Sequence, residues 1–195
     1  VRFIGNHSSG KMGVSLANNA IQKGADVTLI HGPIQVELPK GSTNIAVTSA
    51  KEMFEACREI QKDAEIIIMS AAVADYTPET TADRKIKKSE QSLKVDLKRT
   101  QDILKFFGDN KLDNQYLVGF ALETDNELEN AKSKLARKNL DLIVLNSLRE
   151  KGAGFKSDTN KITLIDKSNK LSNFELKSKQ DVARDILSVI KENLS

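Results

Sequence analysis

Two lysines, Lys134 and Lys138, are the first candidates for chemistry, because a spacing of four residues places them on one face of a helix. Like charges at this spacing repel each other in water, whereas an anion bound between them would make the pair favourable. One turn earlier the chain carries Asn130, so that position supplies no acidic partner. The pair is therefore typical either of a solvated basic face, which is the commoner case, or of a triphosphate site.

A glycine- and serine-rich turn at residues 5–13 leads into apolar residues at helical spacing, and Gly24 is a natural end for that helix. Free backbone N–H groups and the positive end of the helix dipole would suit a phosphate there. The turn matches neither the dinucleotide-binding fingerprint nor the P-loop. From spacing alone, a phosphate site and an ordinary helix cap remain about equally favoured.

The run Ile66–Met69 predicts a strand buried on both faces. Small residues follow it and leave room for a ligand at its carboxyl end, where open α/β sheets bind their ligands. Asp75 comes next and could coordinate Mg²⁺, hold a ribose hydroxyl or cap the following turn. The segment Thr77–Ser92 contains the basic residues around Lys85 and lacks apolar periodicity, which is typical of a functional lid or of a disordered loop. Its position after the strand and Asp75 suggests an anionic ligand.

The remaining periodicities predict strands that alternate with helices. Strands are expected at residues 27–30, 45–47, 93–97, 116–120, 140–145 and 162–165, the last at a sheet edge. Helices are expected at 50–61, after Thr100, along a stripe of Leu128, Ala131 and Leu135, and over 182–190. This alternation predicts an α/β fold with a Rossmann-like, mostly parallel sheet, helices on both faces and a small antiparallel edge extension.

The composition excludes several classes of protein. A net charge of +3 is too small to argue for nucleic acid, and no apolar run is long enough to span a bilayer. The single cysteine, Cys57, shares a helical face with Met53 and Phe54, which predicts a core thiol rather than a nucleophile. Neither His7 nor His31 has partners at metal-ligand spacing, so zinc is not expected. We expect a cytoplasmic protein.

Six short motifs in one order carry a resemblance to a known family. They are Asn-His-Ser-Ser-Gly-Lys-Met-Gly at 6–13, Ala-Ala-Val-Ala-Asp-Tyr at 71–76, Lys-Ile-Lys-Lys at 85–88, Gly-Phe-Ala at 119–121, Arg-Lys-Asn-Leu-Asp at 137–141 and Gly-Phe-Lys-Ser-Asp at 154–158. With these motifs the chain resembles the phosphopantothenoylcysteine synthetase half of bacterial bifunctional coenzyme A biosynthesis proteins, over almost all of its length.

The resemblance implies a CTP-dependent ligase that joins 4′-phosphopantothenate to cysteine through an acyl-cytidylate, with Mg²⁺ as cofactor. It implies that residues 1–195 are one ligase domain from which the family's first strand and glycine-rich loop are missing. FMN would belong only to a fused N-terminal decarboxylase domain that this chain does not contain. The implied partners are the three small substrates and a second copy of the chain, with higher-order assembly possible through the fused domain.

The resemblance also assigns roles to single residues. It makes Asn6 and Lys85 catalytic, places phosphopantothenate on Arg2 and Asn6, and makes Asp75 a candidate Mg²⁺ ligand. The residues implied to bind the nucleotide are Ser8, Gly10, Ala71, Ala72, Asp75, Lys85, Asp102, Ile103, Phe120, Lys134 and Lys138. One departure lies beside them, because the family's Asn-Pro is Thr100-Gln101 in this chain.

Two rival functions stay open at this stage. A nicotinamide-dependent oxidoreductase would need a glycine fingerprint and a proton donor, and neither is visible in the sequence. A polyanion-binding module would use the lid lysines and show steep salt dependence without nucleotide turnover. Pyrophosphate release with CTP, phosphopantothenate and cysteine, each omitted in turn, distinguishes the three.

Overall fold

Three parallel strands form the centre of the sheet: β3 (Ile66–Met69), β6 (Tyr116–Glu123) and β7 (Leu142–Ser147). Two antiparallel strands, β9 (Ile162–Asp166) and β10 (Leu171–Asn173), extend it in the order β10-β9-β7-β6-β3. The structure is a computed structural model that describes residues 4–81, 94–123, 125–147 and 157–194. The predicted α/β fold with a parallel sheet and an antiparallel extension is confirmed.

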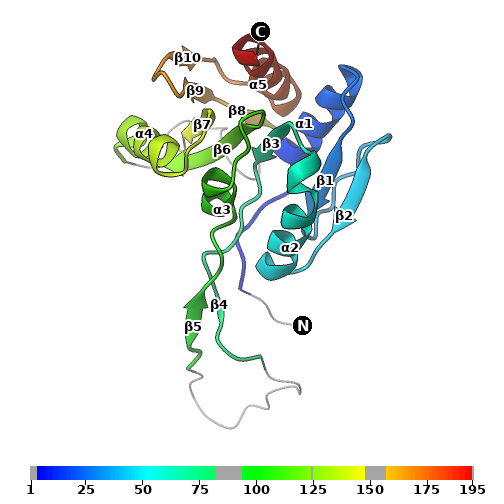
Figure 1. The fold of residues 1–195 in the computed structure, drawn as a ribbon, viewed down its shortest axis with the longest axis vertical. Helices are drawn as coiled ribbons and strands as arrows, with labels where there is room; N and C mark the ends of the chain where they lie inside the picture. The colour runs from blue at the N-terminus through cyan, green and yellow to red at the C-terminus, as the bar shows by residue number, and fades with distance from the viewer. Residues whose placement is uncertain (1–3, 82–93, 124, 148–156, 195) are drawn as a thin grey trace.

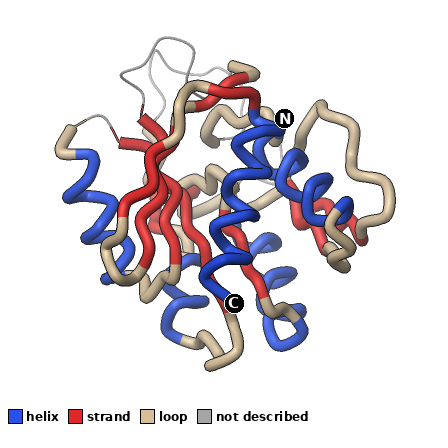
Figure 2. Tube along the Cα trace, turned by 90° about the horizontal axis from the view of Figure 1, so that it is seen from above, coloured by secondary structure: helices blue, strands red, loops and turns tan. Residues whose placement is uncertain are grey.

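Helices cover both faces of this sheet (Figures 1 and 2). One face carries α1 (Lys11–Gln22) and α5 (Lys179–Leu194), and the other carries α2 (Ala50–Ile60), α3 (Ile103–Asp109) and α4 (Glu127–Arg137). A 3-10 turn, Gln61–Asp63, follows α2. Side chains of β6 alternate between the two cores, because Val118 packs with the α1 and α5 layer whereas Leu117 packs with the other three helices.

Within the described residues, three short strand pairs lie outside the central sheet. Parallel strands β1 (Thr28–His31) and β2 (Thr43–Ala46) form one pair, and β8 (Thr159–Asn160) with β11 (Lys177–Ser178) forms another. The third is an antiparallel ribbon of β4 (Tyr76–Pro78) and β5 (Leu97–Arg99). This ribbon projects away from the body of the molecule (Figure 1).

Two predictions about sheet position are wrong. β3 is not fully buried, because Ile66 is 43% exposed and the other three residues are only half-buried; it pairs only with β6 and so lies at an edge of the described sheet. β9 is not an edge strand, because β10 pairs with its outer side and Ile165 is fully buried. The segment that forms β10 reads Leu-Ser-Asn, which is too short and too polar to predict a strand from periodicity.

Three local predictions also need correction. The expected lid contains β4 at its start, since Thr77 and Pro78 pair with β5. The strand expected at 93–97 begins only at Leu97 in the described residues. On α4, Ala131 and Leu135 of the predicted stripe are buried, but Leu128 is 43% exposed. Leu128 lies in the first turn of the helix, which does not pack against the core.

Cys57 is the core thiol that the pattern predicted. It is buried on α2 in the core beneath α3, and burial raises the pKa of its thiol to about 11. A thiol with this pKa is protonated at neutral pH and is a poor nucleophile.

Candidate functional site

Several of the predicted site residues meet at the carboxyl ends of β3 and β6. The loop that follows β3 carries Ala71 and Ala72, the first exposed and the second half-buried. Asn6 reaches this loop from the N-terminal segment and donates from Nδ2 to the carbonyl oxygen of Val73 at 3.2 Å. The first motif and the second, far apart in the sequence, therefore form one surface.

Thr100 holds the other side of the same loop. Its hydroxyl donates to the Ala74 carbonyl oxygen at 2.7 Å, and its backbone N–H donates to the Asp75 carbonyl oxygen at 2.9 Å. A proline is absent at the next position, yet the segment still enters α3 through Asp102, whose carboxylate accepts from the Lys105 N–H at 2.9 Å. The departure from the family's Asn-Pro leaves this helix capped.

Lys134 on α4 and Lys138, directly after this helix, point back to the same place. Lys134 donates from Nζ to the Phe120 carbonyl oxygen at 2.8 Å, near the end of β6. Lys138 directly follows the last residue of α4, and its Nζ forms an ion pair with the Asp102 carboxylate. Four residues predicted to bind nucleotide, from three different segments, are thus brought together: Asp102, Phe120, Lys134 and Lys138.

Charge and burial at this cluster favour an added anion. Burial lowers the pKa of Lys134, and Lys138 adds to that shift, whereas Glu123, Asp102 and Asp75 oppose it without cancelling it. Burial raises the pKa of Asp102, but the hydrogen bonds from Lys138 and Lys105 outweigh this and leave the pKa below its ordinary value. A phosphate that approaches would stabilise the charged form of an ammonium that has lost contact with water and lies near a second ammonium.

The N-terminus of α1 lies against the loop after β3. Gly10 precedes the helix with φ 75°, and an added Cβ would lie 2.6 Å from the Ile34 side chain, so only glycine fits. An added Cβ at Gly13 would lie 3.2 Å from Ser70 Oγ, which places this end of α1 beside the end of β3. Ser8 is exposed, and the Gly10 and Lys11 N–H groups make only long hydrogen bonds of 3.5 Å, to the Ser8 and Ser9 hydroxyls, so this end of the helix is suited to a phosphate.

Three other predicted site residues need separate comment. Arg2 and Lys85 lie outside the described residues. The Ile103 side chain is buried in the core and is 4% exposed, so any contact with a nucleotide would come from its backbone N–H at the start of α3.

Sequence reasoning missed Asn146, which lies near the carboxyl end of β7 and pairs in register with Leu122. Its side-chain oxygen is buried and accepts no hydrogen bond within the described part of the chain. Such an atom costs free energy unless a donor reaches it, and a ligand at the end of β7 could supply one. The signal in the sequence was a polar residue directly after the apolar run at 140–145.

A magnesium ion fits this arrangement only if a nucleotide accompanies it. Across residues 4–81, 94–123, 125–147 and 157–194, no three His, Cys, Asp or Glu side chains gather closely enough to hold a metal ion. Asp75 is exposed and could supply one carboxylate oxygen. Protein-bound Mg²⁺ is usually held by one or two carboxylates together with substrate phosphates and water.

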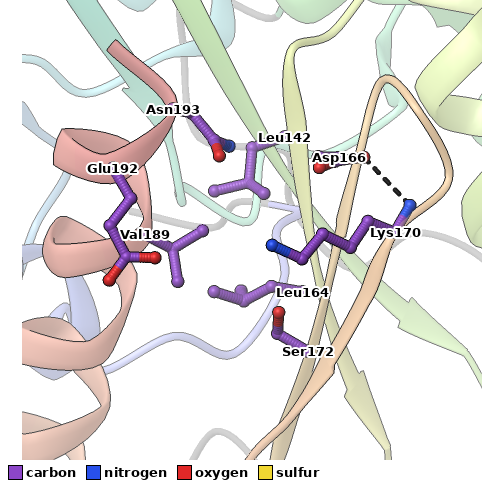
Figure 3. A pocket seen from close by; sticks show the side chains of 8 residues that line it. All are labelled: Leu142, Leu164, Asp166, Lys170, Ser172, Val189, Glu192 and Asn193. Carbon is purple, nitrogen blue, oxygen red and sulfur yellow. Dashed lines mark hydrogen bonds between the residues drawn. The ribbon is translucent and has the colours of Figure 1, made fainter. Parts of the chain in front are cut away.

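Two cavities lie away from this cluster, at the amino ends of β6 and β7. The smaller, of about 20 Å³, lies between α5 and the sheet (Figure 3). Its lining residues are Leu142, Leu164, Asp166, Lys170, Ser172, Val189, Glu192 and Asn193. The larger, of about 360 Å³, lies beside Tyr116 and Asp141. Open α/β sheets bind ligands at the opposite, carboxyl end, which is where the predicted site residues meet.

None of the helices in the described part of the chain is both long enough and apolar enough to cross a membrane.

The chain is similar over most of its length to several known proteins. A protein from an unknown prokaryotic organism, named cysteine/cysteine sulfinic acid decarboxylase, is 53% identical over 191 residues, which are 97% of this chain and 53% of that protein. The coenzyme A biosynthesis bifunctional protein CoaBC of Bacillus subtilis is 47% identical over 97% of this chain and 47% of its own length. The chain therefore spans about half the length of the curated relatives it matches.

Among solved structures, the C-terminal domain of a coenzyme A biosynthesis bifunctional protein CoaBC superposes with a TM-score of 0.84 and 39% identity. The match covers 100% of this chain and 87% of that one. The family described as DNA/pantothenate metabolism flavoprotein C-terminal domain matches residues 1–194. The chain belongs to this family of DNA/pantothenate metabolism flavoprotein C-terminal domains.

Proposed function

We propose that this chain is a phosphopantothenate–cysteine ligase domain that uses CTP. The observation that carries the proposal is the cluster of Asp102, Phe120, Lys134 and Lys138 at the carboxyl end of the sheet. It supplies two ammonium groups for a triphosphate beside a strand end and a loop of small residues. The names of the B. subtilis relative and of the solved CoaBC C-terminal domain place both proteins in coenzyme A biosynthesis.

The proposed reaction has two steps. A carboxylate oxygen of 4′-phosphopantothenate attacks the α-phosphorus of CTP, and the bond to the β-phosphate breaks to release pyrophosphate. The cysteine amine then attacks the acyl carbon, CMP leaves with the bonding electrons, and the amine loses a proton. Mg²⁺, when bound with the nucleotide, would neutralise phosphate charge.

Residues of the described chain support each step. Lys134 and Lys138 would hold the triphosphate and stabilise the negative charge that builds on it as the carboxylate attacks. Asn6, from the N-terminal segment, contacts the loop after β3, where its amide could donate to the acyl oxygen in the second step. We propose Lys85 as a further cation from the segment after β4; it lies outside the described residues.

We propose that the functional unit is a homodimer formed through the β4–β5 ribbon. Three apolar side chains on or next to this ribbon are largely exposed: Tyr76 at 45%, Val95 at 48% and Leu97 at 46%. Exposed strand edges with apolar side chains are usually paired or covered. Sedimentation velocity at micromolar concentration tests the proposal, and a fully active monomer would refute it.

The proposed activity is tested by pyrophosphate release with CTP, phosphopantothenate and cysteine. Release that needs CTP and phosphopantothenate but not cysteine, with an acyl-cytidylate trapped by acid quench, is the expected result for the first step. Nucleotide binding without turnover in any mixture would instead indicate the polyanion-binding alternative. The relative named cysteine/cysteine sulfinic acid decarboxylase is matched over only 53% of its length, so we do not assign the decarboxylase activity in its name to this chain.

We propose that Ala71, Ala72 and Phe120 line a site of pyrimidine size, so CTP should be preferred over ATP. Polar groups that hydrogen-bond the cytosine edge would be left unpaired by adenine, and unpaired polar groups discriminate strongly. Equal catalytic efficiency with the two nucleotides would contradict this part of the proposal.

A further inference from the structure

We propose that Gly108 and Asn139 are positioning residues that fix Lys138 in the nucleotide site by clamping the end of α4 onto the end of α3. The inference rests on the proposed nucleotide role of Lys138. Asn139 belongs to the Arg-Lys-Asn-Leu-Asp motif at 137–141, for which the ligase chemistry so far gives only Lys138 a task.

The contact at Gly108 is made by backbone against backbone. Gly108 is buried near the end of α3, and an added Cβ would lie 1.9 Å from the Lys138 carbonyl oxygen and 2.8 Å from its carbonyl carbon. No side chain larger than hydrogen fits there without displacing the backbone of Lys138. The close packing of α3 at Gly108 therefore determines where the backbone of Lys138 lies.

Asn139 adds a hydrogen bond to the same contact with Gly108. It has φ 50°, in the left-handed region that ends many helices, and its side-chain amide donates to the Gly108 carbonyl oxygen at 2.8 Å. Its own carbonyl oxygen accepts from Lys111 Nζ at 3.0 Å. The same ammonium donates to Asp141 Oδ2 at 2.8 Å, so the turn after α4 is tied both to the segment after α3 and to the start of β7.

Lys138 is held at its backbone by the contact with Gly108 and at its side chain by Asp102. Its side chain is 13% exposed and forms an ion pair with Asp102, the N-cap of α3. α3 spans 7 residues, so the turn after α4 contacts both of its ends, Asp102 through the Lys138 ammonium and Gly108 through the backbone. A shift of the Gly108 contact would move the ammonium away from the end of β6, where Lys134 donates to Phe120.

The substitution Asn139→Gly tests the clamp with little backbone strain, because glycine adopts a positive φ readily and only the amide is lost. Its matched control is Asn169→Gly, at φ 63° in the turn between β9 and β10. We expect the Kd for CTP, measured by calorimetry with Mg²⁺, to rise about threefold to tenfold for Asn139→Gly, as the loss of one hydrogen bond allows. Asn169→Gly should leave the Kd unchanged.

A double-mutant cycle with Lys138→Met separates positioning from a general structural effect. If Asn139 acts through Lys138, Asn139→Gly should weaken CTP binding in the natural chain and have no further effect in the Lys138→Met background. The same fold-change in both backgrounds, or no change in either while Lys138→Met alone weakens binding, would overturn the clamp. If Lys138→Met itself leaves the Kd unchanged, the proposed nucleotide role of Lys138 fails first.

Gly108→Ala provides a second perturbation of the same contact. We expect it to raise the Kd for CTP in the same direction as Asn139→Gly and to leave the KM for cysteine unchanged. If this variant does not fold, which circular dichroism would show, the Asn139 cycle decides the question. A folded Gly108→Ala with a natural Kd for CTP would contradict the clamp.

Discussion

Replacing Lys134 by methionine should separate its role in ligand binding from its role in folding. The Lys134 ammonium is partly buried, donates to the Phe120 carbonyl oxygen at 2.8 Å, and has a pKa that burial lowers. Methionine has a similar length and no charge, so it keeps the packing of the stem and removes only the ammonium. The substitution therefore deletes one donor from the proposed triphosphate site.

The expected loss of affinity follows from one charged hydrogen bond. Hydrogen bonds to charged groups contribute about 1.5–3 kcal/mol, which corresponds to an increase of about 10-fold to 150-fold in the Kd for CTP. The effect on folding should be smaller, because two changes oppose each other. The Phe120 carbonyl oxygen loses a donor, but an ammonium no longer has to be kept away from water. We expect the free energy of unfolding to change by less than about 1 kcal/mol.

Calorimetric titration with CTP and urea unfolding measure the two quantities on the same protein. Lys132→Met is the matched control, because Lys132 lies on α4, pairs with Glu129 at 3.7 Å, and has no predicted part in the site. The control should bind CTP as the natural chain does. A Kd for Lys134→Met within a factor of about three of the control would refute the assignment. So would a loss of several kcal/mol in stability with unchanged binding, since Lys134 would then be structural.

The lowered pKa of Lys134 means that its proton is lost below the ordinary value of 10.5, so CTP affinity should fall as the pH rises through that lowered pKa. The unfolded chain binds this proton more tightly, so stability should rise over the same pH window, and Lys134→Arg, charged at any accessible pH, should flatten both titrations. Cys57 has a pKa of about 11 and is buried, so iodoacetamide at pH 8 should modify it only as fast as the chain unfolds; rapid labelling of the folded protein, followed by mass spectrometry, would contradict its place in the core. Leu117→Ala removes a fully buried side chain from β6 and should lower the free energy of unfolding by about 2–5 kcal/mol in urea titrations, whereas a loss below about 1 kcal/mol would show that the core refills the space.

The sequence by itself determined the class of fold and most of its helices. The apolar spacing after residue 10 and Gly24 predicted α1, which spans Lys11–Gln22, and the apolar run at 140–145 predicted the region of β7. These predictions succeed because the period of apolar residues reports which face of a segment is buried, and that is a local property. The motifs, read in order, also indicated the family.

Only the tertiary structure decided which segments meet. Periodicity could not show that β9 is interior and β3 lies at an edge of the described sheet, because strand neighbours are chosen by contacts between distant segments. The spacing of Lys134 and Lys138 left a solvated face as the commoner explanation. In the fold, one lysine reaches a carbonyl of β6 and the other reaches Asp102 on α3, 36 residues away. The chemistry of the pair follows from these long-range contacts, because burial and charged neighbours, which set a pKa, come from parts of the chain that local sequence does not place.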